Sequence, residues 1–124
     1  MGKALMVGIP AAALASGNEY NLFGSGNPSS TEVNSQIDCT EAATFSGLGA
    51  NITAGNSGTA TFRFRKNATN GNQTFDVTGS PGVGEAISSL EDVLTAGDDF
   101  NIAYTDTGTD STLAWSRMNV VFSS

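Results

Sequence analysis

The chain has 124 residues, enough for one domain that removes roughly two-thirds of its unfolded surface from water. Its 5 basic and 12 acidic residues give a net charge of −7 at pH 7, which argues against nucleic-acid binding, because that binding needs clustered Lys and Arg. The absence of histidine removes the commonest general base and metal ligand. Charged residues form only 14% of the chain, so Ser, Thr, Asn and Gly must cover the surface, which is more usual for a subunit packed against neighbours.

The amino-terminal residues 1–15 are apolar and look at first like an export signal. They are too few to cross a bilayer as a helix, and we expect no membrane partner. Pro10 excludes the middle of a helix or of a central strand, so residues 1–16 are predicted to form an edge strand or an extended arm, followed by the domain at 17–124. We predict that the arm contacts a neighbouring subunit, and a first strand within its own domain is the alternative. The predicted partner-binding residues are Leu5, Met6, Val7 and Ile9.

Three strands are expected before residue 55. The first is short and spans 20–23, and the second spans 33–39, where Val33, Ser35, Ile37 and Cys39 alternate with polar neighbours. The third spans 44–53, and its alternation slips at Gly47, which predicts a β-bulge. As the single cysteine, Cys39 excludes an intramolecular disulfide, and we expect a small buried apolar residue there.

Residues 57–67 form the least ambiguous strand, which we expect at the centre of the core. Ala60, Phe62 and Phe64 fall on one face, whereas Thr and Arg residues occupy the other, as in a strand with one buried side. The dipeptide Asn70-Gly71 predicts a hairpin turn. The returning strand then spans 73–78 and places Phe75 and Val77 in the core.

The last part of the chain contains one ambiguous segment. Residues 85–95 have apolar residues at helical spacing, and we favour a strand or irregular edge over a short helix. A strand follows with Phe100, Ile102 and Tyr104 on one face, and then a polar hairpin loop at 105–111. The phase of the last strand slips near Ser116-Arg117, which predicts either a second bulge or a strand that leaves its own sheet to pack elsewhere. Seven or eight short strands at this spacing predict an all-β fold, a single antiparallel, jelly-roll-like β-sandwich.

No catalytic, cofactor-binding or metal site is predicted, and we do not expect an enzyme. We expect the acidic pairs Glu91-Asp92 and Asp98-Asp99 to be solvated surface rather than calcium ligands or a general acid and base. Arg63 and Arg65 could bind a carboxylate or an anionic glycan, but pairing with acidic neighbours such as Asp76 is favoured. An aromatic sugar platform would comprise Trp115, Tyr104 and Tyr20, and core packing is the favoured role of Trp115.

Six short motifs are spread over residues 19–122. In chain order they are Tyr20-Asn21-Leu22-Phe23-Gly24, Ser30-Thr31-Glu32-Val33, Thr44-Phe45-Ser46, the strand at 58–65 followed by Lys66-Asn67, Thr95-Ala96-Gly97-Asp98, and Leu113-Ala114-Trp115-Ser116. Together they resemble a group of small β-sandwich structural proteins of tailed phages, which includes capsid decoration (cement) proteins and head domains of fibres. The resemblance implies a trimer of jelly-roll-like subunits. Residues 85–94 depart from it, since they are more acidic and more helical in pattern.

We therefore predict a virion structural protein that binds the outer surface of a phage head as a trimer and stabilises it, with the major capsid protein as its partner. The alternative is a receptor- or glycan-binding head domain of a tail fibre or spike. It ranks second because such a head is expected to follow a trimeric stalk, which this sequence does not contain.

Overall fold

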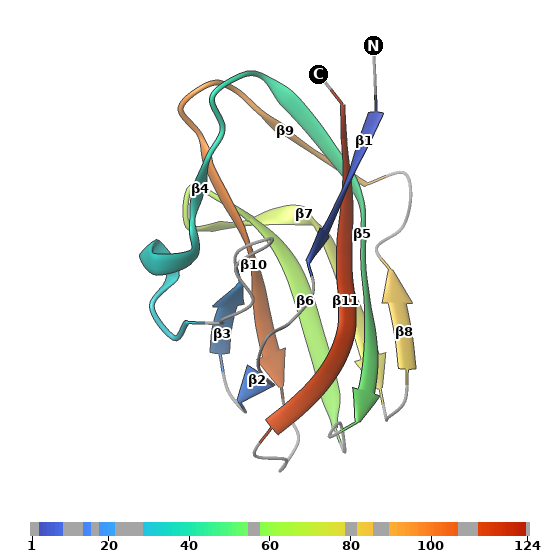
Figure 1. Ribbon diagram of the computed structural model, residues 1–124. Coiled ribbons are helices and arrows are strands. Elements are labelled where there is room, and N and C mark those ends of the chain that lie inside the picture. The colour runs from blue at the N-terminus through green and yellow to red at the C-terminus, as the bar shows by residue number, and fades with distance from the viewer. Residues whose placement is uncertain are drawn as a thin grey trace.

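The computed structural model describes residues 3–8, 14–15, 18–21, 29–54, 58–78, 82–85, 90–106 and 112–123. These residues form two antiparallel sheets that pack face to face as a β-sandwich (Figure 1). The first sheet contains β1 (Lys3–Gly8), β2 (Leu14–Ala15), β5 (Ala43–Ala54), β8 (Gly82–Glu85), β9 (Glu91–Leu94) and β11 (Thr112–Ser123). The second contains β3 (Asn18–Asn21), β4 (Ile37–Asp38), β6 (Thr59–Lys66), β7 (Thr69–Thr78) and β10 (Asp99–Asp106).

The predicted all-β fold, one antiparallel β-sandwich, is confirmed. The described residues form more strands than the seven or eight expected, because the amino-terminal residues supply β1 and the two-residue β2, and β8 precedes β9. Residues 85–95 contribute strand rather than helix where they are described, since β8 ends at Glu85 and β9 pairs with β5. No helix among the described residues is long and apolar enough to cross a membrane.

The core lies between the sheets and is rich in aromatic rings. Strand β6 supplies Phe62 and Phe64, both fully buried, which confirms the alternation predicted for this strand. Phe62 stacks on Phe75 of β7 at 5.1 Å between ring centroids, and Phe64 stacks on Phe100 of β10 at 5.9 Å. Burial of a Phe side chain contributes roughly 1.5–3 kcal/mol, so these rings account for much of the driving force that closes the sandwich.

Both predicted bulges are present. Gly47 has a φ of +63°, and the register between β5 and β11 shifts beside it, between Asn119 and Val121. A second shift falls between Trp115 and Arg117 of β11, which leaves Ser116 as the extra residue. A third shift lies between Ala114 and Trp115. A bulge bends a strand and increases its twist, so the three shifts let the 12-residue strands β5 and β11 curve together along the sheet.

The hairpin of β6 and β7 is confirmed, but the predicted turn at Asn70-Gly71 is wrong. Asn67 and Ala68 form the turn, with φ of 48° and 59°, the two positive values of a type I′ hairpin turn. Asn70 instead pairs with Arg65 inside the hairpin. Gly71 leaves room for the side chain of Asp92, because a Cβ placed there would lie 2.5 Å from an oxygen of that carboxylate.

The strand predicted at 33–39 is largely wrong. A 3-10 helix, η1 (Glu32–Ser35), occupies its first half, and only β4 remains as strand. The side chain of Val33 is 70% exposed, so the alternation that suggested a strand does not reflect burial at this position. Cys39 is buried, as predicted.

The amino-terminal strand β1 lies at one edge of the first sheet and pairs antiparallel with β11 of the same chain. Figure 1 shows this strand running alongside β11, with both chain ends at the same end of the molecule. The backbone of Leu5, Met6 and Val7 therefore belongs to the sandwich. Ile9 and the side chains of the other three lie outside the described residues, so their contact with a neighbouring subunit stays a prediction.

Candidate functional site

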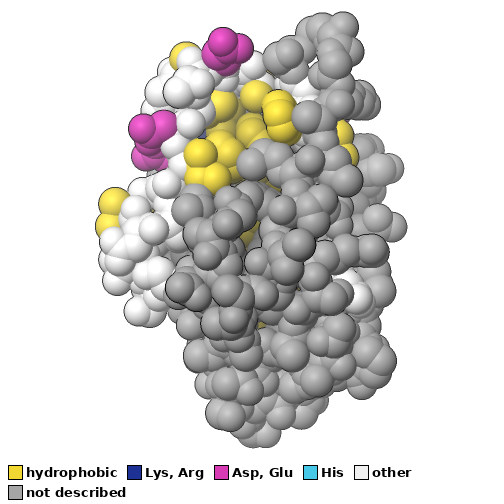
Figure 2. All heavy atoms as spheres, in the orientation of Figure 1, with side chains coloured by type: hydrophobic (Ala, Val, Ile, Leu, Met, Phe, Trp, Pro, Cys, Tyr) yellow, Lys and Arg dark blue, Asp and Glu magenta, His cyan; other side chains and the backbone are white. Residues whose placement is uncertain are grey.

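A hollow of about 270 Å³ opens at one end of the sandwich, where β4 and the segment linking it to β5 pass over the gap between the sheets. Its lining combines apolar and polar residues. They are Ile37, Asp38, Cys39, Thr40, Glu41, Ala42, Ala43, Phe45, Phe100 and Phe122. Figure 2 shows a patch of hydrophobic side chains on this face, with acidic side chains beside it.

Three phenylalanine rings from both sheets form the apolar part of the lining. Phe45 and Phe122 are register partners on β5 and β11, with ring centroids 5.9 Å apart. Phe100 comes from β10 in the second sheet, and its ring centroid lies 4.7 Å from that of Phe45. The rings meet because each falls on the inward face of its strand, at the end where the two sheets separate.

The polar part of the lining comes from the segment between β4 and β5. Asp38, Thr40 and Glu41 are exposed, whereas Cys39 between them is buried and donates its S–H to the carbonyl oxygen of Glu41. Two backbone hydrogen bonds, one donated and one accepted by Cys39, tie this segment to the turn before β10 at 2.7 and 2.8 Å. The rim is therefore held in place by backbone contacts that leave its side-chain oxygens accessible.

Two carboxyl groups lie beside each other on the outer side of the second sheet, because Asp99 precedes the inward-facing Phe100 on β10. Asp38 of β4 and Asp99 of β10 are register partners, and a hydrogen bond joins their side chains. That bond raises the pKa of Asp99 above its ordinary value, and burial and the charges of Asp38 and Asp98 raise it further. Ionisation of both groups would place two negative charges side by side, which favours the neutral form of Asp99.

The pKa of the neighbouring acid, Asp98, is shifted in the opposite direction. Its carboxylate accepts hydrogen bonds from the backbone and hydroxyl of Thr95 and from the side-chain amide of Asn67, and it forms an ion pair with Lys66 at 3.0 Å. These contacts hold the pKa of Asp98 well below its ordinary range, and the hydrogen bond from the Thr95 backbone contributes most. Asp98 therefore links the β6–β7 turn at Asn67 to the turn before β10, and it is not a free surface charge.

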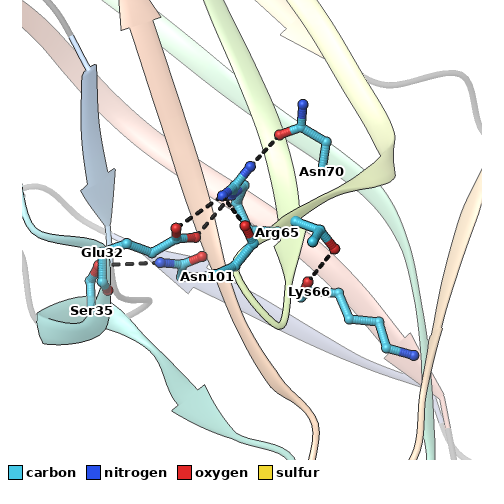
Figure 3. Close-up of polar contacts among 8 residues, drawn as sticks. Glu32, Ser35, Arg65, Lys66, Asn70 and Asn101 are labelled. Carbon is cyan, nitrogen blue, oxygen red and sulfur yellow. Dashed lines mark hydrogen bonds and ion pairs between the residues drawn. The ribbon is translucent and has the colours of Figure 1, made fainter.

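Arg65 does not pair with Asp76, as the sequence had suggested. Its guanidinium instead binds both oxygens of Glu32 in η1, at 2.8 and 2.9 Å, and also contacts Asn70 and the carbonyl oxygen of Ala68 (Figure 3). Asp76 accepts a hydrogen bond from Thr61 at 2.7 Å. The expectation of an acidic partner was correct, but the partner comes from a segment 33 residues away in sequence.

Beside Arg65, η1 also contacts β10. Asn101 of β10 donates a hydrogen bond to the hydroxyl of Ser35 at 3.3 Å, and both side chains are 1% exposed (Figure 3). The helix η1 is thus fixed to the outer face of the second sheet, and Arg65 is engaged in that attachment.

The prediction that Asp92 is solvated surface is wrong, because its side chain is only 4% exposed. Its two oxygens accept hydrogen bonds from the backbone N–H groups of Asn72 and Gln73 and from the side-chain amide of Gln73. Gln73 in turn binds the backbone of Leu48 and Phe45 in β5. Asp92 and Gln73 thus form a polar joint between the sheets, which links β9 and β5 of the first sheet to β7 of the second.

No group of His, Cys, Asp and Glu among the described residues could hold a metal ion.

No protein-family model and no curated protein matches this sequence. Among solved structures, the chain is similar to a Podospora anserina GH26-CBM35 β-(1,4)-mannanase, with a TM-score of 0.52 and 11% identity over 97% of this chain and 28% of that one. It is also similar to a family 35 carbohydrate-binding module from Clostridium thermocellum, with a TM-score of 0.50 and 13% identity over 94% of this chain and 97% of that one. The chain thus spans little more than a quarter of the mannanase. At these identities the matches show a shared β-sandwich fold.

The described residues do not form the aromatic sugar platform that the sequence suggested as one possibility. Tyr104 is buried and lies against Phe62, with ring centroids 5.4 Å apart, so it belongs to the core. The side chains of Trp115 and Tyr20 lie outside the described residues. Sequence reasoning missed the hollow because its rings come from three strands far apart in the chain. The only available signal was the pairing of inward-facing Phe residues with the polar segment at 38–41.

Proposed function

We propose that this chain is a carbohydrate-binding domain without catalytic activity, and that the hollow binds a sugar residue. The observation that carries the proposal is the combination, in one concave place, of the half-buried ring of Phe122 and the largely buried rings of Phe45 and Phe100 with the exposed side chains of Thr40 and Glu41. Ligand sites are typically apolar hollows with a few polar groups that fix orientation.

The two halves of the lining match the two sides of a sugar ring. A pyranose presents apolar C–H groups on its faces and hydroxyl groups around its edge. Aromatic side chains provide large apolar surfaces for the former, and carboxylates accept hydrogen bonds from the latter. The volume of about 270 Å³ lies at the lower end of the range for ligand pockets, so we propose that one ring enters and any further rings remain outside.

The similarity to a family 35 carbohydrate-binding module over nearly the full length of both chains supports this proposal. A β-sandwich can serve many functions, so the argument rests on the hollow and the fold adds to it. Binding without catalysis is supported by the lack of histidine and by the roles of the described acids, since Glu32, Asp92 and Asp98 each hold structural contacts.

A glycan array, followed by calorimetric titration with the best ligand, tests the proposal. Ala42 lines the hollow and is exposed, so Ala42→Trp should fill the opening without disturbing the core and should reduce affinity about tenfold or more. Thr74→Trp, at an exposed position of β7 outside the hollow, is the matched control and should bind normally. A protein that binds no glycan, or an Ala42→Trp variant with unchanged affinity, would refute the proposal.

Decoration of a phage capsid as a trimer remains a prediction from the sequence resemblance, with the major capsid protein as partner and the capsid surface as location. Its test is separate from the one above. The full chain should sediment with empty phage heads and should have the mass of a trimer in light scattering. A monomer that stays in the supernatant would count against it.

A further inference from the structure

We infer that β1 pairs edge to edge with β1 of a second copy of this chain, so that two sandwiches share one continuous sheet across a two-fold axis. The inference does not depend on the proposed sugar site, and it differs in symmetry from the trimer predicted from the sequence. It follows from the free edge of β1, from the way other strand edges are closed, and from the charge of the strands beside β1.

Among the described strands, β1 has a partner on one side only. It ends the strand order β1-β11-β5-β8, and it pairs with β11 over six consecutive residues without a register shift. In an antiparallel ladder, successive residues direct their N–H and C=O groups to opposite edges, so every second residue of β1 offers both groups to a further strand. A regular edge of this kind is a template for pairing with another chain.

The edges at the other end of the strand order are closed by side chains. The carboxylate of Asp92 accepts hydrogen bonds from two consecutive backbone N–H groups of β7. In β9, the carbonyl oxygens of Glu91 and Val93 accept hydrogen bonds from the side chains of Asn72 and Lys66. The four-residue strands β3 and β8 each contain a glutamate, and a charge on a short edge strand discourages pairing. Strand β1 is longer and contains no acidic residue.

The strands next to β1 are also free of acidic residues. Strands β1, β11 and β5 are neighbours in the sheet and together contain Lys3 and Arg117 but no Asp or Glu. The rest of the chain contains all 12 acidic residues and three basic ones, a net charge of −9. Two copies that met through those parts would bring negative charges together, whereas a contact through β1 would not. The charge distribution therefore favours β1 as the place where two copies meet.

A second copy fits this edge because it brings an identical one. A two-fold axis perpendicular to the sheet relates two β1 strands as antiparallel neighbours, which is the arrangement that an antiparallel ladder requires. Leu5 is the register partner of Val121, which is half-buried, whereas the adjacent Val120 is buried. Leu5 and, two residues further on, Val7 therefore fall on the outer face of the sheet, where a substitution leaves the core intact.

The mass of the full chain in solution provides the first test. Light scattering over a dilution series should give the mass of two chains at high concentration. Leu5→Lys places a like charge on each of the paired strands and should weaken the dimer about tenfold or more. Val93→Lys, at a 62% exposed position of β9 in the same sheet, is the matched control and should leave the dimer unchanged.

Cysteine scanning along β1 provides the second test. In a two-fold antiparallel pair one residue lies opposite its own copy, close enough for a disulfide between the chains. Oxidation should therefore give a covalent dimer most efficiently at one position in the middle of β1. The four variants are Ala4→Cys, Leu5→Cys, Met6→Cys and Val7→Cys. Glu91→Cys, exposed on β9, and the parent chain with its buried Cys39 are the controls and should stay unlinked.

A monomer throughout the dilution series would overturn the inference. A mass of three chains would also overturn it and would favour the predicted trimer. A dimer that keeps its affinity in Leu5→Lys, or that fails to cross-link at any position of β1, would place the interface elsewhere and overturn the pairing. If circular dichroism shows that Leu5→Lys does not fold, the cysteine variants decide. None of these outcomes changes the test of sugar binding, so the proposed function stands or fails separately.

Discussion

Two acidic sites in this molecule are built in opposite ways. At the polar joint, Asp92 is buried, and both of its oxygens accept hydrogen bonds from Asn72 and Gln73 of β7. Near the hollow, Asp38 and Asp99 are register partners, so each acid lies beside another acid instead of an N–H group. The first arrangement satisfies a carboxylate within the chain, which is what a structural role requires. The second places two acids together, which favours the neutral form of Asp99.

The largest effect is expected from removing the buried carboxylate. Asp92→Ala leaves three N–H groups of the joint without their acceptor, and each unsatisfied buried group costs roughly 1–3 kcal/mol. We expect a loss of about 3 kcal/mol in the free energy of unfolding, measured by urea denaturation. Asp92→Asn should lose nearly as much, because both oxygens accept hydrogen bonds and one becomes an NH₂ group.

The neighbouring exposed acid is the control for that experiment. Glu91→Ala should change the free energy of unfolding by no more than about 0.5 kcal/mol. If Asp92→Ala were equally harmless, the buried acid would not be structural and the contrast with the hollow would collapse.

A smaller loss is expected from crowding the same carboxylate. A Cβ at Gly71 would lie 2.5 Å from Oδ1 of Asp92, a side-chain oxygen that cannot move away without losing the hydrogen bond it accepts from the backbone N–H of Asn72. Gly71→Ala should therefore cost about 2 kcal/mol in urea denaturation. Gly97→Ala is not a suitable control, because Gly97 has a φ of +93° and would be strained for its own reason. Val93→Ala, at a 62% exposed position of β9, should be nearly neutral.

The acids at the hollow end should respond to pH with opposite signs. The pKa of Asp98 is lowered in the folded state, so its contribution to stability is present above its ordinary value of 3.8 and is lost as the pH falls below it. The pKa of Asp99 is raised, so its contribution is present below 3.8 and is lost as the pH rises through the folded-state value.

Substitution of each acid should reveal that difference. At pH 7, Asp98→Asn should lower the melting temperature, whereas Asp99→Asn should raise it slightly by removing the repulsion with Asp38. Melting curves recorded from pH 3 to pH 7 on both variants and the parent chain would measure this. A lower melting temperature for Asp99→Asn at pH 7 would show that the pair is satisfied in a way that the two carboxyl groups alone do not explain.

The smallest effect is expected at Val33. Because its side chain is 70% exposed in η1, Val33→Ser should change the free energy of unfolding by less than about 0.5 kcal/mol. The matched core substitution Val77→Ser, in β7, should cost several times more, since Val77 is 4% exposed. A large loss in the free energy of unfolding at Val33 would indicate that its side chain is buried, as the strand predicted at 33–39 required.

The positions of the strongest strands follow from local sequence. The alternation of Phe62 and Phe64 with polar residues has a period of two, and only a strand places such residues on one face. The same holds for Phe100 and Ile102 in β10, and the phase slips at Gly47 and Ser116 mark the bulges because an extra residue reverses the faces. These patterns require no knowledge of the partner strand, so the sequence by itself determined an all-β sandwich and its core strands.

Tertiary structure decided which groups meet. Glu32 reaches Arg65 and Asp92 reaches Gln73 across long stretches of chain, and neither pairing has a local signal. The hairpin turn falls at Asn67-Ala68, whereas Gly71 lies beside Asp92, a contact visible only once β7 and β9 are in place. The hollow likewise exists only where the two sheets separate. Periodicity reports the burial of each residue along its own strand, whereas contacts between strands depend on register and sheet order, which short patterns do not encode.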